Sequence, residues 1–250
     1  MVDWLCLGVK MSSAALRNVF ATLLWFGYLF VISFAHSNES LIVYTELSPP
    51  YQTYDGKRVG GIATERVRAL LAHANLKATI EMVPWARAMK KVQESDNTLI
   101  FSVGRIPERE DQFHWIAPVA RYEMSFVALT KRHDITPERL IDLTSYTFAV
   151  QRNDMSYKWL KRKGLTENKQ LLVCPDIACS WRYIMAGHVD LMFEDASLIE
   201  QTAADFGYDA NRLKVLKRVP ELAVDAYLVA PKTMHLATVE KLKKAAEKIK

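Results

Sequence analysis

Short apolar runs alternate with amphipathic stretches along this chain, and this alternation constrains the fold more than any other feature. Leu41–Thr45, Ala78–Val83 and Leu99–Val103 are rich in β-branched and other apolar residues, which is typical of buried strands. Between the first two of these runs, apolar residues from Ile62 to Leu71 recur at helical spacing. Strands separated by helices predict a parallel sheet with helices on its faces, so we expect a doubly wound α/β domain.

A second set of strand and helix patterns begins after Thr130. A strand is expected from Glu123 to Thr130, before this second set. The later elements are strands over 146–151 and 170–173, helices over 156–162 and 180–185, two strands within 215–229 and a closing helix over 239–250. A chain of 250 residues with half its composition apolar is long enough for two domains of this kind.

The third strand ends in a pattern that suits a carboxylate ligand. Gly104 permits a close approach to the backbone, and Pro107 suits the first turn of a helix. Arg109 follows within that turn, so its guanidinium is expected beside unpaired backbone amides. The alternative is an ordinary surface arginine on a solvated helix.

The N-terminus is typical of an export signal. Lys10 and Arg17 precede an apolar run over 19–32, and Ser33 and Ala35 supply the small residues of a cleavage site. We therefore expect residues 1–35 to be a signal peptide, which places the mature protein in the periplasm. An uncleaved membrane anchor is the alternative.

Two further expectations concern the ends of the mature chain. It should begin close to His36, whether translation starts at Met1 or at Met11. The closing lysine-rich segment over 241–250 alternates with apolar residues and is expected to be a solvated helix.

Composition excludes several functional classes. The net charge of +5 is scattered, and no nucleic-acid-binding module is present, so we expect no nucleic-acid partner. The sequence lacks the nucleophile elbow, the zinc-protease motif and the phosphate loop. We therefore expect no catalytic residues, no cofactor and no bound metal, and we expect a monomer.

Cysteine usage agrees with export. Cys6 lies in the predicted signal peptide, which leaves Cys174 and Cys179 in the mature chain. An even number in an oxidising compartment, separated by a short connection, suggests a disulfide. Two buried free thiols are the alternative.

The order of motifs resembles the bacterial extracellular solute-binding proteins of family 3, the amino-acid-binding components of ABC transporters. The segments that carry the resemblance are Ser48-Pro-Pro-Tyr51, Asp55-Gly56, the helix after Gly61, Pro84-Trp85, Pro107-Glu108-Arg109, Phe113–Pro118 and Gly187–Asp195. The resemblance implies an α/β, two-lobed periplasmic-binding-protein-like fold of type II, with a cleft between two doubly wound domains. Lobe one would comprise residues 37–125 and 218–250, and lobe two residues 126–217. Family chains usually continue somewhat further, so this chain is expected to be cropped at its C-terminal end.

The resemblance also implies a ligand site. The ligand carboxylate would lie on Arg109, Ser102 and Gly104, and its α-ammonium group on Asp195. Asp195 as a helix cap is the alternative, and alternation along the strand predicts that Glu194 faces solvent.

Further residues are expected near the predicted cleft. Trp85 and Tyr51 would supply aromatic contacts there, although both also suit a core. Glu46 and Arg87 add charge that typical family members do not require.

Three departures from the family pattern leave the ligand less defined than the fold. Ile106 replaces the usual threonine, Ser48 replaces a stacking aromatic residue, and Arg152-Asn-Asp154 replaces an anion-binding turn.

The sequence thus predicts a binding protein that captures a small zwitterionic or anionic ligand, an amino acid above all, by hinge closure and delivers it to a membrane permease. A dehydratase-like cleft enzyme, in which Glu46 or Asp195 acts as acid or base, is one alternative. A sensor module that presents the ligand to a receptor is the other.

Overall fold

The computed structural model describes residues 40–249. The predicted signal peptide and the two candidate start sites lie outside these residues. Within the described part of the chain, no helix combines the length and apolar character needed to cross a membrane.

The first lobe is built on three parallel strands, in which β1 lies between β4 and β5. Its elements are β1 (Leu41–Thr45), β2 (Thr53–Asp55), β3 (Arg58–Gly60), α2 (Ile62–His73), β4 (Ala78–Met82), α3 (Trp85–Glu94) and β5 (Thr98–Gly104). The strand–helix alternation of the sequence is confirmed here. All seven residues of β5 are buried, and the apolar run Leu99–Val103 had predicted a buried strand here.

The helix predicted at Pro107 is instead a short 3₁₀ helix, η2 (Pro107–Gln112). Eight residues separate the end of β5 from the next strand, and the six that form η2 leave room for two 3₁₀ turns and no longer helix.

The second lobe repeats the α/β pattern, and its strands β8, β7 and β9 run parallel. Its regular elements are β7 (Phe148–Gln151), α4 (Met155–Arg162), β8 (Leu171–Cys174), α5 (Ile177–Ala186), β9 (Leu191–Asp195) and α6 (Ile199–Asp205). Three short 3₁₀ helices complete it: η3 (Pro137–Ile141), η4 (Leu143–Ser145) and η5 (Ala210–Arg212).

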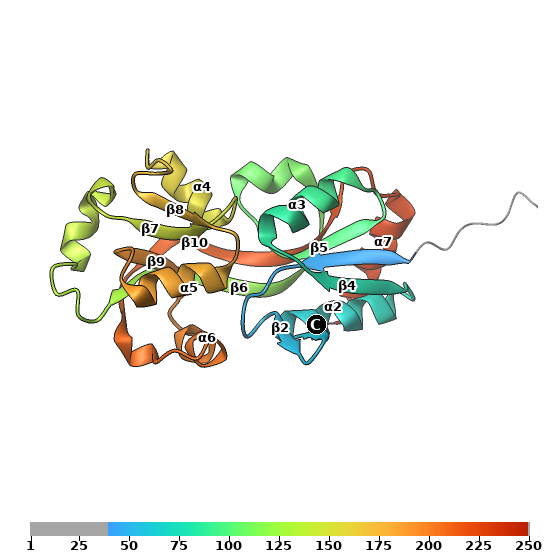
Figure 1. Cartoon of the computed structure of the whole chain (residues 1–250). Coiled ribbons are helices and arrows are strands. Elements are labelled where there is room, and N and C mark those ends of the chain that lie inside the picture. Colours follow the sequence, from blue (N-terminus) through green and yellow to red (C-terminus); the bar gives the residue numbers. More distant parts are fainter. Residues whose placement is uncertain (1–39, 250) are drawn as a thin grey trace, which may run out of the picture. The chain divides into compact units, whose positions relative to one another are not determined.

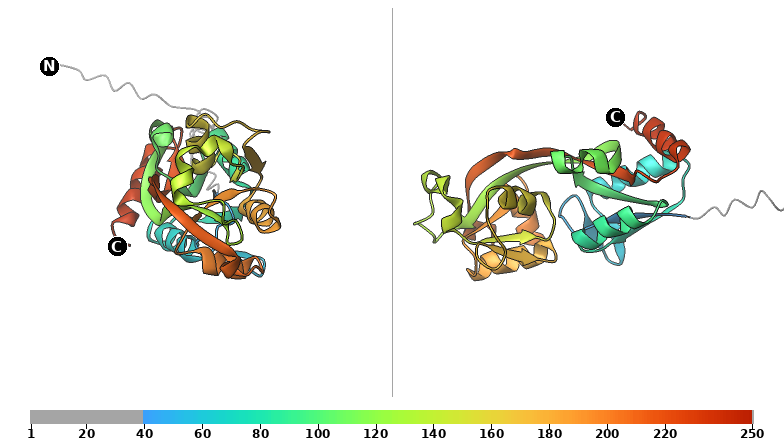
Figure 2. Two further views of the ribbon diagram at one scale, coloured as in Figure 1. Left: turned by 90° about the vertical axis from the view of Figure 1, so that its left-hand side faces the viewer. Right: turned by 90° about the horizontal axis from the view of Figure 1, so that it is seen from above.

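Two long strands belong to both lobes. β6 (Phe113–Leu129) and β10 (Leu213–Pro231) pair antiparallel along their length, and they lie at the centre of the sheet order β4-β1-β5-β10-β6-β9-β7-β8. Figure 1 shows them running from one group of helices and strands to the other, and the view from above in Figure 2 shows them side by side. The last helix, α7 (Leu236–Ala246), returns to contact α2 and β6.

The sequence divided these long strands wrongly. It predicted a strand from Glu123 and two strands within 215–229, whereas β6 starts at Phe113 and β10 is a single strand. Their pairing shifts register between Arg218 and Ala223, close to the predicted lobe boundaries at 125/126 and 217/218. Those boundaries remain a prediction.

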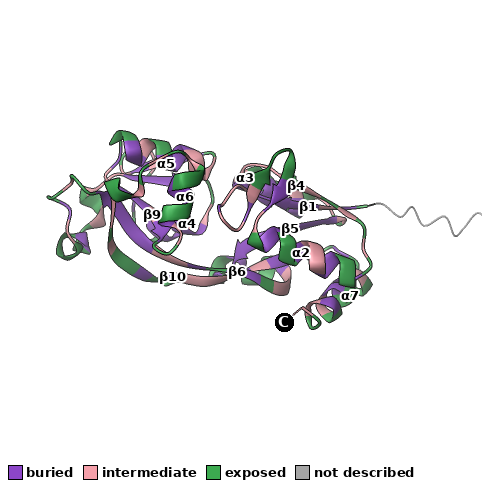
Figure 3. Ribbon diagram, turned by 90° about the horizontal axis from the view of Figure 1, so that it is seen from below, coloured by how far each residue is buried: buried purple, intermediate pink, exposed green. Residues whose placement is uncertain are grey.

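The core lies on both faces of the sheet. Figure 3 shows buried strands in the interior and exposed outer faces on helices such as α2 and α7. In the second lobe, Phe126, Phe148, Trp159 and Phe193 form an aromatic cluster with ring centroids 4.9–6.2 Å apart. Such aromatic packing contributes beyond the area that it buries.

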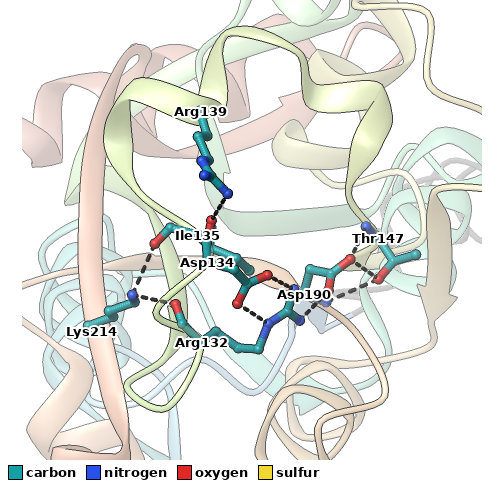
Figure 4. Close-up of polar contacts among 7 residues, drawn as sticks. All are labelled: Arg132, Asp134, Ile135, Arg139, Thr147, Asp190 and Lys214. Carbon is teal, nitrogen blue, oxygen red and sulfur yellow. Dashed lines mark hydrogen bonds and ion pairs between the residues drawn. The ribbon is translucent and has the colours of Figure 1, made fainter.

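A polar network holds the loop between β6 and β7 against the second lobe (Figure 4). Arg132 pairs with Asp134 and with Asp190, and Asp190 also accepts a hydrogen bond of 2.8 Å from the backbone of Thr147. The ammonium group of Lys214 on β10 donates to the carbonyls of Arg132 and Ile135 at 2.6 and 3.0 Å. The network therefore fixes a long irregular segment to β10 and to the start of β7 by ion pairs and backbone contacts.

Candidate functional site

A cavity of about 70 Å³ lies where the two lobes meet. The first lobe contributes residues at the ends of β1 and β5, and the second lobe contributes residues of β7, β9, α4 and α5. Ligand pockets usually have volumes of roughly 300–1,000 Å³. The small volume follows from contacts that bring the two lobes close together around it.

The carbonyl of Asn153 is the centre of these contacts between the lobes. It accepts hydrogen bonds from Trp85 Nε1 at 3.0 Å and from Arg109 Nη2 at 3.1 Å. Asn153 has φ of 62°, a left-handed conformation that Asn adopts more readily than most residues. A second contact joins Gln151 Nε2 to a carboxylate oxygen of Glu46 at 2.6 Å.

Arg109 lies in the cavity wall and is almost completely buried, with 1% of its surface exposed. Its guanidinium lies over the Trp85 ring at 5.0 Å and donates to the Gly104 carbonyl at 3.2 Å. Its Nε has no hydrogen-bond partner among residues 40–249. Burial lowers the pKa of Arg109 to about 10, and the charges of Asp154 and Glu46 oppose that shift. A buried guanidinium with an unused donor is suited to a ligand oxygen.

Ser102 and Gly104 also lie in the cavity wall. Ser102 has φ of 61°, and its hydroxyl accepts a hydrogen bond from Gln52. A Cβ atom at Gly104 would lie 3.2 Å from the sulfur of Met155 on α4. The absence of a side chain at Gly104 therefore lets the second lobe approach closely.

Two acidic side chains face the cavity beside Arg109. Burial, together with the nearby Asp154 charge, raises the pKa of the Glu46 carboxyl to about 8. Asp154 begins α4 and accepts a hydrogen bond from the backbone of Tyr157. Burial raises the pKa of Asp154 to about 6, against the lowering effects of that hydrogen bond and of Arg109. The sequence had marked Asp154 only as part of a departure from the family pattern.

The expected partner for an ammonium group, Asp195, is not brought to the cavity. One of its oxygens accepts from the backbone N–H of Glu123 at 2.8 Å, and the other accepts from the backbone and hydroxyl of Ser197. The carboxylate is therefore occupied in holding β6 and the turn after β9, which is closer to the capping alternative.

Glu194 lies in the cavity wall, where Asp195 was expected. The prediction that it faces solvent is wrong, because it is 4% exposed and lies in the cavity wall. It accepts hydrogen bonds from Trp181 Nε1 at 2.9 Å and from the backbone of Asp195 at 3.0 Å. Burial raises the pKa of Glu194 to about 7, although both hydrogen bonds act to lower it.

Of the two aromatic residues expected at the site, Trp85 lies in the cavity wall and Tyr51 does not. Tyr51 packs edge-on against Tyr122 at 5.3 Å, and its hydroxyl donates to the Arg121 carbonyl. Tyr122 occupies the cavity wall instead, with Ser48 Oγ 3.2 Å from its hydroxyl. Burial raises the pKa of Tyr122, so this phenol stays neutral.

Sequence reasoning missed the contribution of α5. Ser180 and Trp181 lie in the cavity wall, and Ser180 Oγ is a second buried polar atom without a partner within the described residues. The signal available in the sequence was the position of this helix directly after a strand, where cleft residues gather in α/β folds.

Cys174 and Cys179 form a disulfide, with their Cα atoms 5.6 Å apart. The bond joins the end of β8 to the first turn of α5. It lies next to Ser180 in the chain, so it constrains the helix that supplies part of the cavity wall.

Two α/β lobes joined by a pair of long strands, with a cavity between them, define the periplasmic-binding-protein-like fold of type II. The sequence matches the model of the bacterial extracellular solute-binding proteins, family 3, over residues 41–250. The chain therefore belongs to this family. No curated protein sequence matches it.

Solved structures support the fold. A histidine kinase sensor domain with similarity to periplasmic binding proteins has a TM-score of 0.72 at 16% identity, covering 84% of this chain and 90% of that one. An ancestral arginine-binding protein bound to arginine has a TM-score of 0.71 at 17% identity, covering 84% and 92%. A periplasmic binding protein of an arginine transport system from Legionella pneumophila has a TM-score of 0.69 at 13% identity, covering 84% and 93%. The family and these neighbours are binding or sensor proteins rather than enzymes.

Proposed function

We propose that this protein binds a small zwitterionic ligand, an amino acid, in the cavity between its lobes, in the periplasm, and delivers it to the permease of an ABC transporter. The observation that carries the proposal is the buried Arg109 guanidinium, whose Nε has no partner within residues 40–249. A ligand carboxylate would satisfy this donor and would lie beside Ser102 and Gly104. Five structural neighbours carry arginine binding or arginine transport in their names, which supports an amino-acid ligand.

Hinge closure is the mechanism that fits the contacts between the lobes. Entry of a ligand larger than the cavity of about 70 Å³ requires the Asn153 and Glu46 contacts to separate, because these contacts hold the two lobes together beside it. A bound ligand would then replace part of these contacts and bridge the lobes. Periplasmic binding proteins are known for closure of this type.

Calorimetry with the purified protein and a panel of amino acids tests the proposal. Loss of the guanidinium in Arg109→Met should lower the affinity by about a hundredfold, since a buried ligand charge loses its partner. Arg87→Met is the matched control, because Arg87, which the sequence placed near the cleft, is an exposed arginine of α3 outside the cavity wall. Melting curves and the Arg109→Lys variant check that the fold is retained. Equal affinity of wild type and Arg109→Met would show that Arg109 does not bind the ligand carboxylate.

A sensor role is the second candidate, favoured by the likeness to a histidine kinase sensor domain. Both roles require binding without turnover, so recovery of the ligand unchanged after incubation also tests the enzyme alternative. Stimulation of the ATPase activity of a reconstituted permease by the loaded protein would support the transport role. Stimulation of a receptor kinase alone would support the sensor role.

A further inference from the structure

The cavity wall holds more negative than positive groups. Among the described residues that line it, three are carboxylic acids, Glu46, Asp154 and Glu194, and one is a guanidinium, Arg109. When all four are ionised, the wall carries two uncompensated negative charges. Such charge in a buried site is costly unless a counter-charge enters or protons are taken up.

The charged groups around the cavity do not remove this imbalance. Asp176 and Glu108 add negative charge near Glu46 and Arg109, whereas Lys158 adds one positive charge near Arg109. Glu194 has Asp195 as its charged neighbour.

Glu46 and Asp154 come from opposite lobes and act on each other. Glu46 follows β1 in the first lobe, Asp154 begins α4 in the second, and each feels the charge of Arg109. One guanidinium neutralises one carboxylate, and in the proposed complex it is also needed by the ligand carboxylate. The pair would then be left without an adequate counter-charge.

We infer that the ligand carries two cationic groups, and that the second of them is held between Glu46 and Asp154 when the lobes close. The inference rests on the proposed amino-acid binding and narrows it to cationic amino acids. A second cation would balance the pair and would replace Gln151 as the partner of Glu46. With a neutral side chain of the same shape, the Glu46 and Asp154 carboxyl groups would lack a counter-charge and would stay protonated.

Pairs of ligands with the same or nearly the same shape and different charge test the inference. L-arginine and L-citrulline differ in their terminal group, a cation in the first and a neutral urea in the second. L-lysine and L-norleucine form a second pair. We expect calorimetry at pH 8 to give each cationic ligand at least tenfold higher affinity than its neutral partner. Equal affinities within both pairs would overturn the inference and leave amino-acid binding intact.

Two variants locate the second cationic group. Glu46→Gln and Asp154→Asn should each move the ratio of arginine to citrulline affinity toward one. Asn at position 154 retains an acceptor for the start of α4, so the helix cap is preserved. Glu81→Gln, at an exposed glutamate of β4, is the matched control and should leave the ratio unchanged. An unchanged ratio in both cavity variants would refute the assignment to this pair.

Putrescine separates this inference from the proposed function, because it has two cationic groups and no carboxylate. Binding of putrescine without binding of any amino acid would support the second cationic site and refute the amino-acid function. Binding of neutral amino acids alone would support the function and refute the inference. If none of these compounds binds, both are refuted.

Discussion

The affinity for a cationic ligand should increase with pH, because the Glu46 carboxyl must lose its proton to pair with a cation. Its pKa of about 8 reflects burial and the proximity of Asp154. About one molecule in a hundred then has Glu46 ionised at pH 6, compared with half of the molecules at pH 8. The apparent affinity for L-arginine should therefore rise about fiftyfold over these two pH units, on the order of 2 kcal/mol of binding free energy. Asp154 and Glu194, with pKa values of about 6 and 7, steepen the dependence at the lower end.

Calorimetry at pH 6, 7 and 8 in buffers with different ionisation heats measures both the affinity and the protons released. Near pH 7, binding should release close to one proton, since Glu46 is mostly protonated before binding and ionised afterwards. L-citrulline has the same α-amino and α-carboxyl groups as L-arginine, so its pH dependence serves as the reference. Glu46→Gln should flatten the arginine profile. A wild-type affinity that is constant between pH 6 and 8 would refute the reasoning.

The same carboxyl affects the stability of the protein without ligand. Its folded-state pKa of about 8 lies above the ordinary value of 4.5, so the folded protein binds more protons than the unfolded chain between these values. The free energy of unfolding should therefore decrease as pH rises through this window. Urea denaturation should show a smaller decrease in Glu46→Gln than in wild type.

Further predictions concern the framework of the site; urea denaturation measures the stabilities, and calorimetry measures the ligand affinity where one is predicted. Removing the disulfide by Cys174→Ser and Cys179→Ser should lower the free energy of unfolding by about 2 kcal/mol, since the bond closes a short loop; an unchanged value would mean that the bond is absent in solution. Gly61→Ala should cost more than about 3 kcal/mol, because φ is 98° and the new Cβ would lie 2.5 Å from a backbone oxygen. Gly207→Ala, with φ of 73° and open space, should cost only about 1 kcal/mol, and equal costs at the two positions would contradict the steric argument. Asp195→Ala should lower the free energy of unfolding by on the order of 2–4 kcal/mol, because buried hydrogen bonds are lost. The same variant should leave the ligand affinity nearly unchanged. A large loss of affinity in a stable variant would show that Asp195 contacts the ligand.

The short strands and the helices could be predicted from the sequence because each has one environment along its whole length. Leu99–Val103 is buried throughout, so its apolar run identifies it. The long strands pass from one lobe to the other, and their surroundings change along the way. β10 is therefore apolar near Val229 and charged around Arg218, a pattern that imitates two strands with a turn between them.

The candidate site was less predictable, because it depends on which face of a strand meets the cavity. The family resemblance placed Asp195 in the cleft and alternation assigned Glu194 to solvent, yet both are buried since β9 is covered on both faces. Alternation separates inward from outward residues only when one face meets water. The role of Asp154 depends on the approach of the two lobes, which no local pattern encodes.

The pairing of β6 with β10 allows the segment between them to be exchanged between related proteins. Leu129 and Leu213 are register partners, so the segment 130–212 starts and ends at neighbouring positions on adjacent strands. Cross-strand partners lie about 5 Å apart, a spacing at which an inserted domain is tolerated without strain on its host. Replacing this segment by its counterpart from a relative would exchange Asp154 and Glu194 together while leaving Glu46 and Arg109 in place. The charge balance of the cavity, and with it the ligand selected, is therefore a property that a single recombination event can change.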